Sequence, residues 1–248
     1  MAIEMKVIDV SKHNGVIDWQ KVKASGIQGV IIRAGYGRML KQKDLNFEEY
    51  YAGATAAGLH VGAYHYSYAR SAAEALVEAS VFLEWVKGKK FDLPVYFDTE
   101  DKSIMNLGKN TLTDCCIAWC NKLEENDYYA GIYASASWFI EHLDLSKLTR
   151  YDKWLAHWAS KPRWGNEFGG LWQYSEKGKV PGIQGNVDLD LCYRDYPSII
   201  KSKGLNGYST TPMYKVTAHI SNIKTKAVAD EVADICQKQG MTTIIEEE

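Results

Sequence analysis

Residues 93–101 read LPVYFDTED, an apolar run that leads into three acidic side chains. Its first half has the near-continuous apolar character of a strand buried on both faces of a parallel sheet. The acidic residues that follow are Asp98, Glu100 and Asp101. Barrel folds of parallel strands keep their functional groups at the carboxyl ends of the strands. We therefore expect similar buried strands on either side of this one.

Seven other short runs, rich in β-branched and aromatic residues, predict further strands. They are residues 7–10, 30–33, 61–64, 129–133, 153–156, 170–174 and 187–190. Helical spacing of apolar residues separates several of them, most clearly in residues 72–86 and 111–125. Alternating strands and helices predict an α/β fold with a mainly parallel sheet, and this number of strands predicts a closed (β/α) barrel. Shorter helical stretches after residue 129 predict an irregular barrel.

A domain boundary is predicted after Pro197. Residues 198–212 contain Lys-Ser-Lys-Gly and Gly-Tyr-Ser-Thr-Thr-Pro, which are typical of a linker. Residues 213–248 then predict a small strand–helix–strand unit, with Asn222 as the N-cap of a helix that carries Val228, Val232 and Ile235 on one face. The catalytic barrel is thus expected over residues 1–197. So short a unit leaves strand edges and apolar surface uncovered, which favours a homo-oligomer through residues 213–248.

The composition excludes several classes of function. The chain of 248 residues carries 29 Lys and Arg against 31 Asp and Glu, so no broad basic field favours nucleic acid. No apolar run approaches the roughly 20 residues that cross a bilayer. The first residues lack a basic segment followed by an apolar one, so we expect no secretory signal and a cytoplasmic location in the producing cell.

The cysteines and histidines do not form a recognisable metal site. The five cysteines are irregularly spaced, and only Cys116 and Cys120 have a spacing that would let them share a helix face and a metal. Small apolar residues of a reduced protein are the favoured interpretation. His13, His65 and His157 lack the close spacing of zinc ligands. No metal and no cofactor are expected.

Asp98 and Glu100 are the strongest candidates for chemistry. They are two residues apart at the end of a strand, so their side chains point to the same side. Repulsion between adjacent carboxylates raises the pKa of at least one. A carboxyl that stays protonated near neutral pH can protonate a leaving glycosidic oxygen, while an ionised neighbour stabilises oxocarbenium-like charge. A salt-bridged or helix-capping pair is the alternative interpretation.

Other acids lie inside apolar strands. Asp9 is in the first predicted strand, and Asp188 and Asp190 are in the last. The first and last strands of a closed barrel are neighbours, and acids in apolar strands are costly unless they line a polar cleft. These residues therefore predict further members of the same site. A structural hydrogen-bond network is the alternative for Asp190.

A set of ordered motifs resembles the glycoside hydrolase family 25 lysozymes, the Chalaropsis-type muramidases found in many phage endolysins. The motifs cover roughly residues 4–197 and are individually weak but specific together. They are VIDVSKHNG (7–15), IDW (17–19), GVIIRA (29–34), GAYHY (62–66), PVYFDTE (94–100), GIY (131–133), WLA (154–156), LWQY (171–174), VPGI (180–183) and DLD (188–190).

The resemblance implies an enzyme that hydrolyses the β-1,4 bond between N-acetylmuramic acid and N-acetylglucosamine of peptidoglycan and so lyses bacterial cells. It implies that Glu100 is the general acid, that Asp98 is the second acid of the pair, and that Asp9 and Asp188 are the acids of the first and last strands. Bacterial peptidoglycan is the implied partner, reached after release from the producing cell. Binding to the wall and docking on the barrel are then the other hypotheses for residues 213–248.

Two other functions and the stereochemistry stay open at this point. One alternative is a non-catalytic peptidoglycan-binding protein on the same barrel, and the other is a metal-dependent hydrolase. Strand geometry places the Cα atoms of Asp98 and Glu100 roughly 6.6–7 Å apart. Carboxyl separations of about 5.5 Å for retention or about 6.5–9.5 Å for inversion are both compatible with that spacing, and the substrate's acetamido group is a further candidate nucleophile.

Aromatic side chains are the candidate sugar contacts, because sugars stack on flat apolar rings. Tyr64, Tyr133 and Trp172 are predicted to contact substrate, while most other aromatic residues fill the core. The chain departs from the family's pattern at three places. It has Arg33 where the family often has Lys, Tyr66 where the family often has Phe, and His13-Asn14 in place of a frequent pairing with Trp.

Overall fold

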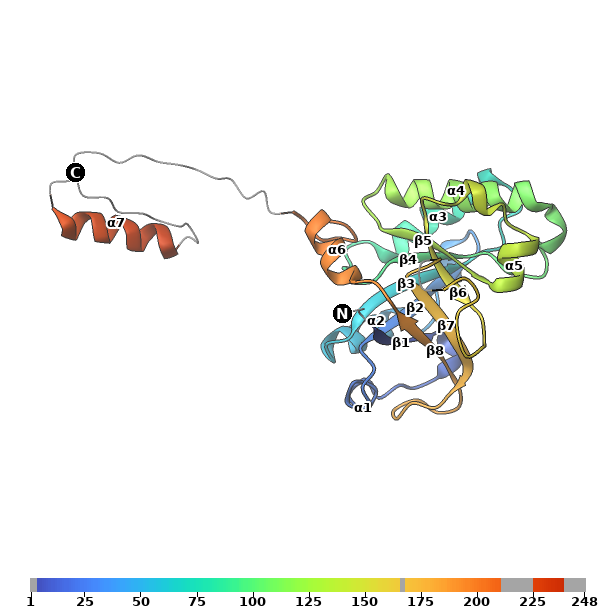
Figure 1. Ribbon diagram of the computed structural model, residues 1–248, viewed down its shortest axis with the longest axis horizontal. Helices are drawn as coiled ribbons and strands as arrows, with labels where there is room; N and C mark the ends of the chain where they lie inside the picture. The colour runs from blue at the N-terminus through green and yellow to red at the C-terminus, as the bar shows by residue number, and fades with distance from the viewer. Residues whose placement is uncertain (1–3, 166–167, 211–224, 239–248) are drawn as a thin grey trace. The chain divides into compact units, whose positions relative to one another are not determined.

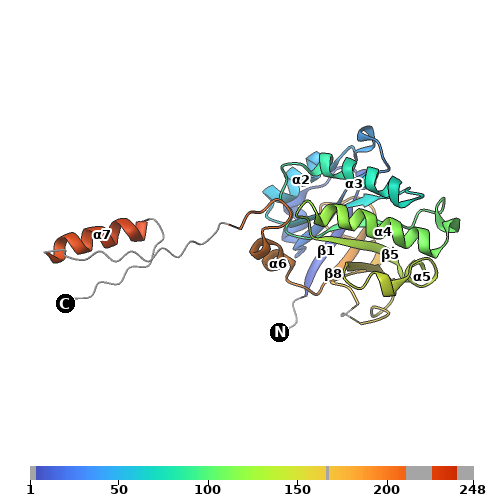
Figure 2. The ribbon, with the colours of Figure 1, turned by 90° about the horizontal axis from the view of Figure 1, so that it is seen from above.

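The computed structural model describes residues 4–165, 168–210 and 225–238. Eight strands close into a barrel in chain order, with helices on the outside (Figures 1 and 2). The strands are β1 (Met5–Val10), β2 (Gly29–Tyr36), β3 (His60–Tyr66), β4 (Val95–Asp98), β5 (Ala130–Ser135), β6 (Asp152–Ala156), β7 (Leu171–Gly178) and β8 (Val187–Cys192). Every predicted strand is present, which confirms the barrel.

The last strand makes the barrel irregular. From β1 to β7 each strand is parallel to the next, whereas β8 is antiparallel to both β7 and β1. Because β8 runs the other way, its first residues lie at the end where the parallel strands finish. The register places Asp188 opposite Asp9 and places Asp190 opposite Val7, which lies further into the barrel.

Helices cover the outside of the barrel. They are α1 (Trp19–Ala24), α2 (Phe47–Ala56), α3 (Ala72–Val86), α4 (Lys109–Glu124), α5 (Ala136–Glu141), α6 (Tyr196–Lys203) and, beyond the barrel, α7 (Lys226–Lys238). The two helices predicted most clearly, over residues 72–86 and 111–125, are confirmed as α3 and α4. Helix α3 begins where the Ser71 side chain accepts a hydrogen bond from the Glu74 amide, and it buries Ala75, Ala79 and Phe82 against the sheet.

Strand alternation sorts the core into two clusters. One fills the barrel interior and includes Val7, Ile31, Tyr96 and Trp154. The other lies between the strands and the helices, with Ile8 and Ile32 among its members. Period-two alternation on each strand explains this division. A side chain can therefore be assigned to the inside or the outside of the barrel from its strand position.

The predicted boundary after Pro197 is wrong. The barrel unit extends to Thr210, and the second unit begins at Thr211. Residues 196–203 form α6, which buries Ile200 and ends at Gly204 in the left-handed conformation. Asn206 is fully buried and joins the starts of two strands, since its side chain accepts from the Tyr129 amide at 2.7 Å and donates to the Leu93 carbonyl at 2.9 Å. The Lys-Ser-Lys run is the solvent side of an amphipathic helix.

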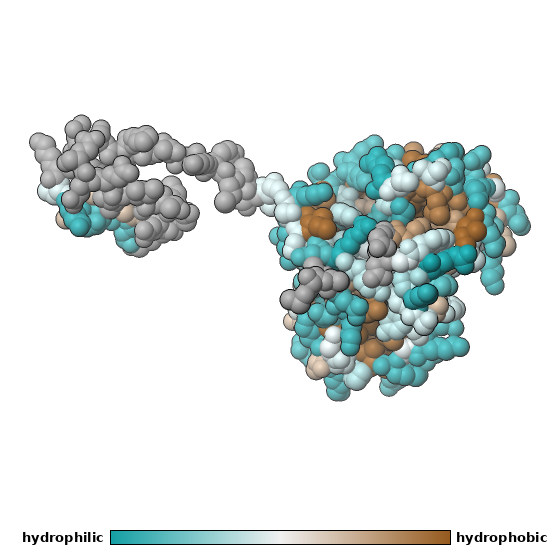
Figure 3. All heavy atoms as spheres, viewed as in Figure 1, coloured by the Kyte–Doolittle hydropathy of each residue, from teal (hydrophilic) through white to brown (hydrophobic). Residues whose placement is uncertain are grey.

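The second unit is described only at α7. This helix begins at Lys226, not directly after Asn222, and the Thr225 carbonyl accepts from the Val228 amide. The strands predicted around it, and Asn222 itself, lie outside the described residues. Val228 and Ile235 are exposed. Among the described helices, none has the length and apolar character needed to cross a membrane. The visible face of the barrel unit is largely polar, with limited apolar patches (Figure 3).

Candidate active site

The acids singled out in the sequence meet at one mouth of the barrel. Asp98 is the last residue of β4, and Glu100 follows it by two residues. Asp9, near the end of β1, is paired with Asp188, near the start of β8. The carboxyl of Asp9 is repelled by those of Asp190, Asp188 and Asp98, and Asp98 is in turn repelled by Glu100. The barrel thus places five carboxyls close enough together to repel one another.

Glu100 is the more open member of the Asp98–Glu100 pair. Its Oε2 accepts a hydrogen bond of 2.8 Å from the Ser135 amide, at the end of β5. Burial raises the pKa of Glu100, and hydrogen bonds from Ser135 and Tyr133 oppose that rise. A partly exposed carboxyl with a raised pKa and a fixed position meets the requirements for a general acid.

Asp98 lies deeper, with 5% of its surface exposed. Burial is the first cause of its strongly raised pKa, and repulsion by Glu100 is the second. The predicted repulsion is therefore present, but burial contributes more. Oδ1 of Asp98 is buried and has no hydrogen-bond partner among the described residues. An unpaired buried oxygen is costly, so this atom is available to a substrate group or to a proton.

Gln173, which the sequence analysis did not select, links the acids to the aromatic side chains. Its Nε2 donates to Asp9 Oδ2 at 2.8 Å. Its Oε1 accepts from the Tyr133 hydroxyl at 3.2 Å and from the Trp158 indole at 3.1 Å. Gln173 is buried, and the strand register aligns it with Asp190. A buried amide between apolar residues of a strand was the signal available in the sequence.

The two acids of β8 have different surroundings. Burial raises the pKa of Asp188 to about 6, while a hydrogen bond with Asp9 opposes the rise. Asp190 is 1% exposed, and its Oδ1 accepts from the Trp154 indole at 2.7 Å. Asp190 thus takes part in a buried hydrogen-bond network at the base of the mouth, and Asp188 lies nearer the solvent.

The predicted sugar contacts are placed very differently from one another. Tyr133 lies at the mouth, with its ring 4.4 Å from that of Trp154. Tyr64 packs edge-on against Trp154 inside the barrel and is 9% exposed. The prediction for Trp172 is wrong, because it is aligned with Leu155 on the outer face of the barrel. It is 7% exposed there and donates to the His157 carbonyl.

Two other aromatic side chains belong to the mouth. Trp158 is 57% exposed, although its indole is fixed by Gln173. Tyr66, at a position where the family often has Phe, donates its hydroxyl to Asp101 Oδ2 at 2.8 Å. Tyr66 therefore fixes the residue next to Glu100. Trp158 offers the exposed flat ring that was expected of Trp172.

No group of three or more His, Cys, Asp or Glu in the described part of the chain is arranged to hold a metal ion. All five cysteines are free thiols, and four of them are buried. Burial raises the pKa of Cys116 above its ordinary value, so this thiol is not activated as a nucleophile.

Comparison with known proteins agrees with this geometry. The family described as Glycosyl hydrolases family 25 matches residues 8–183. The chain belongs to glycosyl hydrolase family 25. An autolytic lysozyme of Clostridium acetobutylicum is 30% identical over 190 residues, which are 75% of this chain and 55% of that protein. The chain thus spans about half the length of that relative.

Solved structures of an endolysin and of a bacterial lysozyme resemble this barrel. The CTP1L endolysin superposes with a TM-score of 0.70 at 29% identity, over 80% of this chain and 70% of that one. A bacterial lysozyme from Streptomyces coelicolor superposes with a TM-score of 0.68 at 25% identity, over 83% of this chain and 98% of that one. The family match over residues 8–183 lies within the barrel unit, which carries the acid mouth.

Proposed function

We propose that this family 25 protein hydrolyses the glycan backbone of bacterial peptidoglycan at the β-1,4 bond between N-acetylmuramic acid and N-acetylglucosamine. The observation that carries the proposal is the Asp98–Glu100 pair in a barrel mouth lined by acids. The relatives support the choice of substrate, since they include an autolytic lysozyme and a modular autolysin solved with a synthetic peptidoglycan ligand. The bacterial cell wall is then the site of action.

Glu100 is proposed as the general acid. Its raised pKa keeps a proton on the carboxyl at higher pH than an ordinary Glu would. This proton passes to the glycosidic oxygen as the bond from that oxygen to the anomeric carbon breaks. The Ser135 amide accounts for the fixed position of Glu100 Oε2. Water supplies the hydroxyl group that completes hydrolysis.

Asp98 is proposed to stabilise the positive charge that develops on the sugar ring. Its Oδ1 has no partner among the described residues, and the positive charge of Arg33 partly offsets the rise that burial causes in its pKa. Positive charge on the ring favours ionisation further as the reaction proceeds. Asp9, held by Gln173, and Asp188 are proposed as supporting acids of the mouth. Tyr133 and Trp158 are proposed to contact the sugar rings.

Product analysis tests the bond that is cut. Borohydride reduction of digested peptidoglycan should label muramic acid, because that sugar carries the new reducing end. Labelled glucosaminitol would instead identify a glucosaminidase, and new amino groups on the stem peptide would identify an amidase or a peptidase. Either result would contradict the proposed specificity.

Substitution of the acid tests the catalytic assignment. Glu100→Gln keeps the shape of the side chain and removes the proton donor, so we expect lysis in a turbidity assay to fall by at least about a hundredfold. Glu125→Gln, on the exposed turn after α4, is the matched control and should retain wild-type lysis. A folded Glu100→Gln protein with a tenth of wild-type activity would exclude Glu100 as the general acid.

A further inference from the structure

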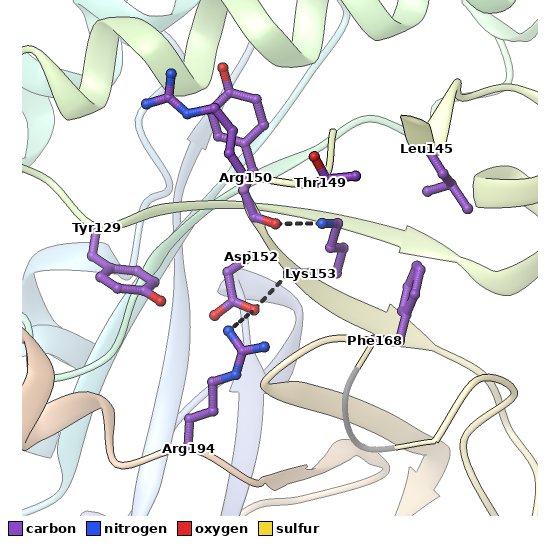
Figure 4. A pocket seen from close by; sticks show the side chains of 9 residues that line it. Tyr129, Leu145, Thr149, Arg150, Asp152, Lys153, Phe168 and Arg194 are labelled. Atoms are coloured by element: carbon purple, nitrogen blue, oxygen red, sulfur yellow. Dashed lines mark hydrogen bonds and ion pairs between the residues drawn. The ribbon is translucent and has the colours of Figure 1, made fainter. Parts of the chain in front are cut away.

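A cavity of about 370 Å³, whose lining side chains are drawn in Figure 4, lies at the foot of the barrel. Tyr129 directly precedes β5, Asp152 begins β6, and Arg194 follows the end of the antiparallel β8. These positions place the cavity where the parallel strands begin. It therefore shares no lining residue with the proposed catalytic site.

Two of the three cations that line this cavity are neutralised by carboxylates. Arg194 pairs with Asp152 Oδ1 at 3.2 Å, and Arg150 pairs with Glu124. The carboxylate of Asp152 also accepts from the amides of Lys153 and Gly170 and from the Tyr196 hydroxyl. Three of these four donors bond Oδ1, and the Tyr196 hydroxyl bonds Oδ2.

Lys153 is the third cation, and it is buried with 7% of its surface exposed. Its ammonium donates to the carbonyls of Leu148 at 2.7 Å and Tyr151 at 2.6 Å. An ammonium has three hydrogens, so one of them has no acceptor among the residues that the structure describes. Among the ion pairs found in the described residues, none involves Lys153. Burial lowers the pKa of this ammonium, and the nearby negative charge of Asp152 only partly offsets that fall.

The walls of the cavity combine polar and apolar groups. Figure 4 shows Asp152 between Tyr129 and Lys153, with Arg194 close by and Leu145 and Phe168 on the side of Lys153. Thr149 adds a hydroxyl at an exposed edge of the cavity. The volume exceeds that of a single water, for which roughly 30 Å³ is sufficient in the liquid. The cavity therefore has room for an anion with a small organic body.

We propose that this cavity is a binding site for a small oxyanion, a carboxylate or phosphate group, that pairs with the Lys153 ammonium and the remaining N–H groups of Arg194. The organic part of the ligand would lie against Leu145 and Phe168. A purely structural role, in which Lys153 only caps the carbonyls of Leu148 and Tyr151, predicts no dependence on anions. The two interpretations are therefore separable by experiment.

Titration calorimetry of the full-length protein with sodium phosphate and with sodium acetate, at constant ionic strength set by chloride, tests the site. We expect saturable one-to-one binding of at least one anion. Phosphate as the tighter ligand would indicate a phosphorylated natural ligand, and acetate as the tighter ligand would indicate a carboxylate. Absence of saturable binding of both anions would overturn the proposal.

Variants locate the binding. Lys153→Met removes the charge and should weaken binding at least tenfold. If that variant fails to fold, Thr149→Glu is the second test, because it places a carboxylate at an exposed edge of the cavity and should also weaken binding at least tenfold. Asn110→Glu makes the same charge change at an exposed position of α4 and should bind as the wild type does. Equal affinity in the wild type and in folded variants of both lining residues would place the anion elsewhere and reject the site.

Discussion

Gln173 joins one acid of the mouth to two aromatic side chains through a single amide. Its donor group faces Asp9, and its acceptor group faces Tyr133 and Trp158. A carboxylate at this position would repel Asp9, and an apolar residue would leave three polar groups without a partner. The position of the catalytic acids and the position of the aromatic rings therefore depend on the same residue.

The pH dependence of activity should report the coupling between Asp98 and Glu100. Repulsion between two ionised carboxylates is mutual, so Asp98→Asn should lower the pKa of Glu100. A general acid is active while protonated, and its activity is lost as pH rises through its pKa. We therefore expect much weaker residual activity whose basic limb is displaced to lower pH. The measurement is the pH profile of kcat/KM on soluble glycan fragments.

The control for this experiment is Asp127→Asn, in an exposed turn where the positive φ of 62° suits Asn. Its pH profile should coincide with that of the wild type. A near-normal rate and an unchanged profile for Asp98→Asn would assign Asp98 a structural role.

Substitution by Ala should have different effects at Trp158 and at Trp172. The first change should weaken substrate binding, and the second should lower the stability of the fold. Trp158→Ala removes an exposed ring, so stability should change by less than about 0.5 kcal/mol, whereas KM for glycan fragments should rise about tenfold. Trp172→Ala removes a buried ring and should lower the free energy of unfolding by about 3–5 kcal/mol. Urea unfolding and steady-state kinetics measure the two effects. A stable Trp172→Ala protein with impaired substrate binding would restore the original assignment.

Among the elements, β8 has the largest influence on the electrostatics of the mouth. Its antiparallel direction brings Asp188 opposite Asp9, while Asp190 stays deeper beside Trp154. A parallel strand in the same place would reverse the depths of the two acids. The accumulation of carboxyls at this strand pair has an energetic cost, since Asp9 is repelled by both acids of β8.

The stability of the barrel should fall with rising pH because of Asp188. Its folded pKa of about 6 lies above the ordinary value of 3.8, so the folded state holds this proton more tightly than the unfolded state does. The associated stability is complete below about pH 3.8 and is lost as pH rises through about 6. Asn does not titrate, so Asp188→Asn does not have this loss. The free energy of unfolding of the variant minus that of the wild type should therefore rise by on the order of 2 kcal/mol from pH 4 to pH 7.

Urea unfolding at a series of pH values measures this difference. Asp114→Asn, an exposed change on α4, is the control and should follow the wild type across the series. A constant difference between Asp188→Asn and the wild type from pH 4 to pH 7 would show that Asp188 does not titrate in this range.

For the whole molecule, the division between the units should determine which truncations fold. Truncation after Thr210 keeps α6 and Asn206, so cleavage of soluble glycan fragments should remain intact. Truncation after Pro197 removes the buried Ile200 and the three side-chain bonds of Asn206 to the strand starts. This shorter protein should lose at least about 3 kcal/mol of stability. Thermal unfolding of both proteins tests the boundary, and equal melting temperatures would contradict it.

The C-terminal unit is proposed to mediate self-association. Its helix α7 exposes Val228 and Ile235, two of the three residues on the predicted apolar face. If these residues pair between copies, light scattering should show an oligomer for the full chain and a monomer after truncation at Thr210, together with slower lysis of whole cells. A full-length protein that is monomeric at tens of micromolar would exclude self-association and leave wall binding as the hypothesis for this unit.

The strands, the main helices and the acids of the mouth were predictable from the sequence, because they follow from local patterns. Apolar runs of strand length identified β1 to β8, and acidic residues within those runs or at their ends pointed to Asp9, Asp98, Glu100 and Asp188. A buried acid in a strand is costly wherever the chain folds, so its presence already indicates a polar cleft.

The face of each strand, the direction of β8 and the end of the barrel unit were decided only by the tertiary structure. Trp172 and Gln173 are adjacent in sequence, yet register with β6 turns the indole outward and the amide inward. Asn206 is polar and lies in a segment that resembles a linker, but the starts of β4 and β5 surround it with backbone groups that need partners. Local sequence specifies what a segment can form, whereas the pairing of distant strands determines which side chains meet, because hydrogen-bond register and burial depend on residues far apart in the chain.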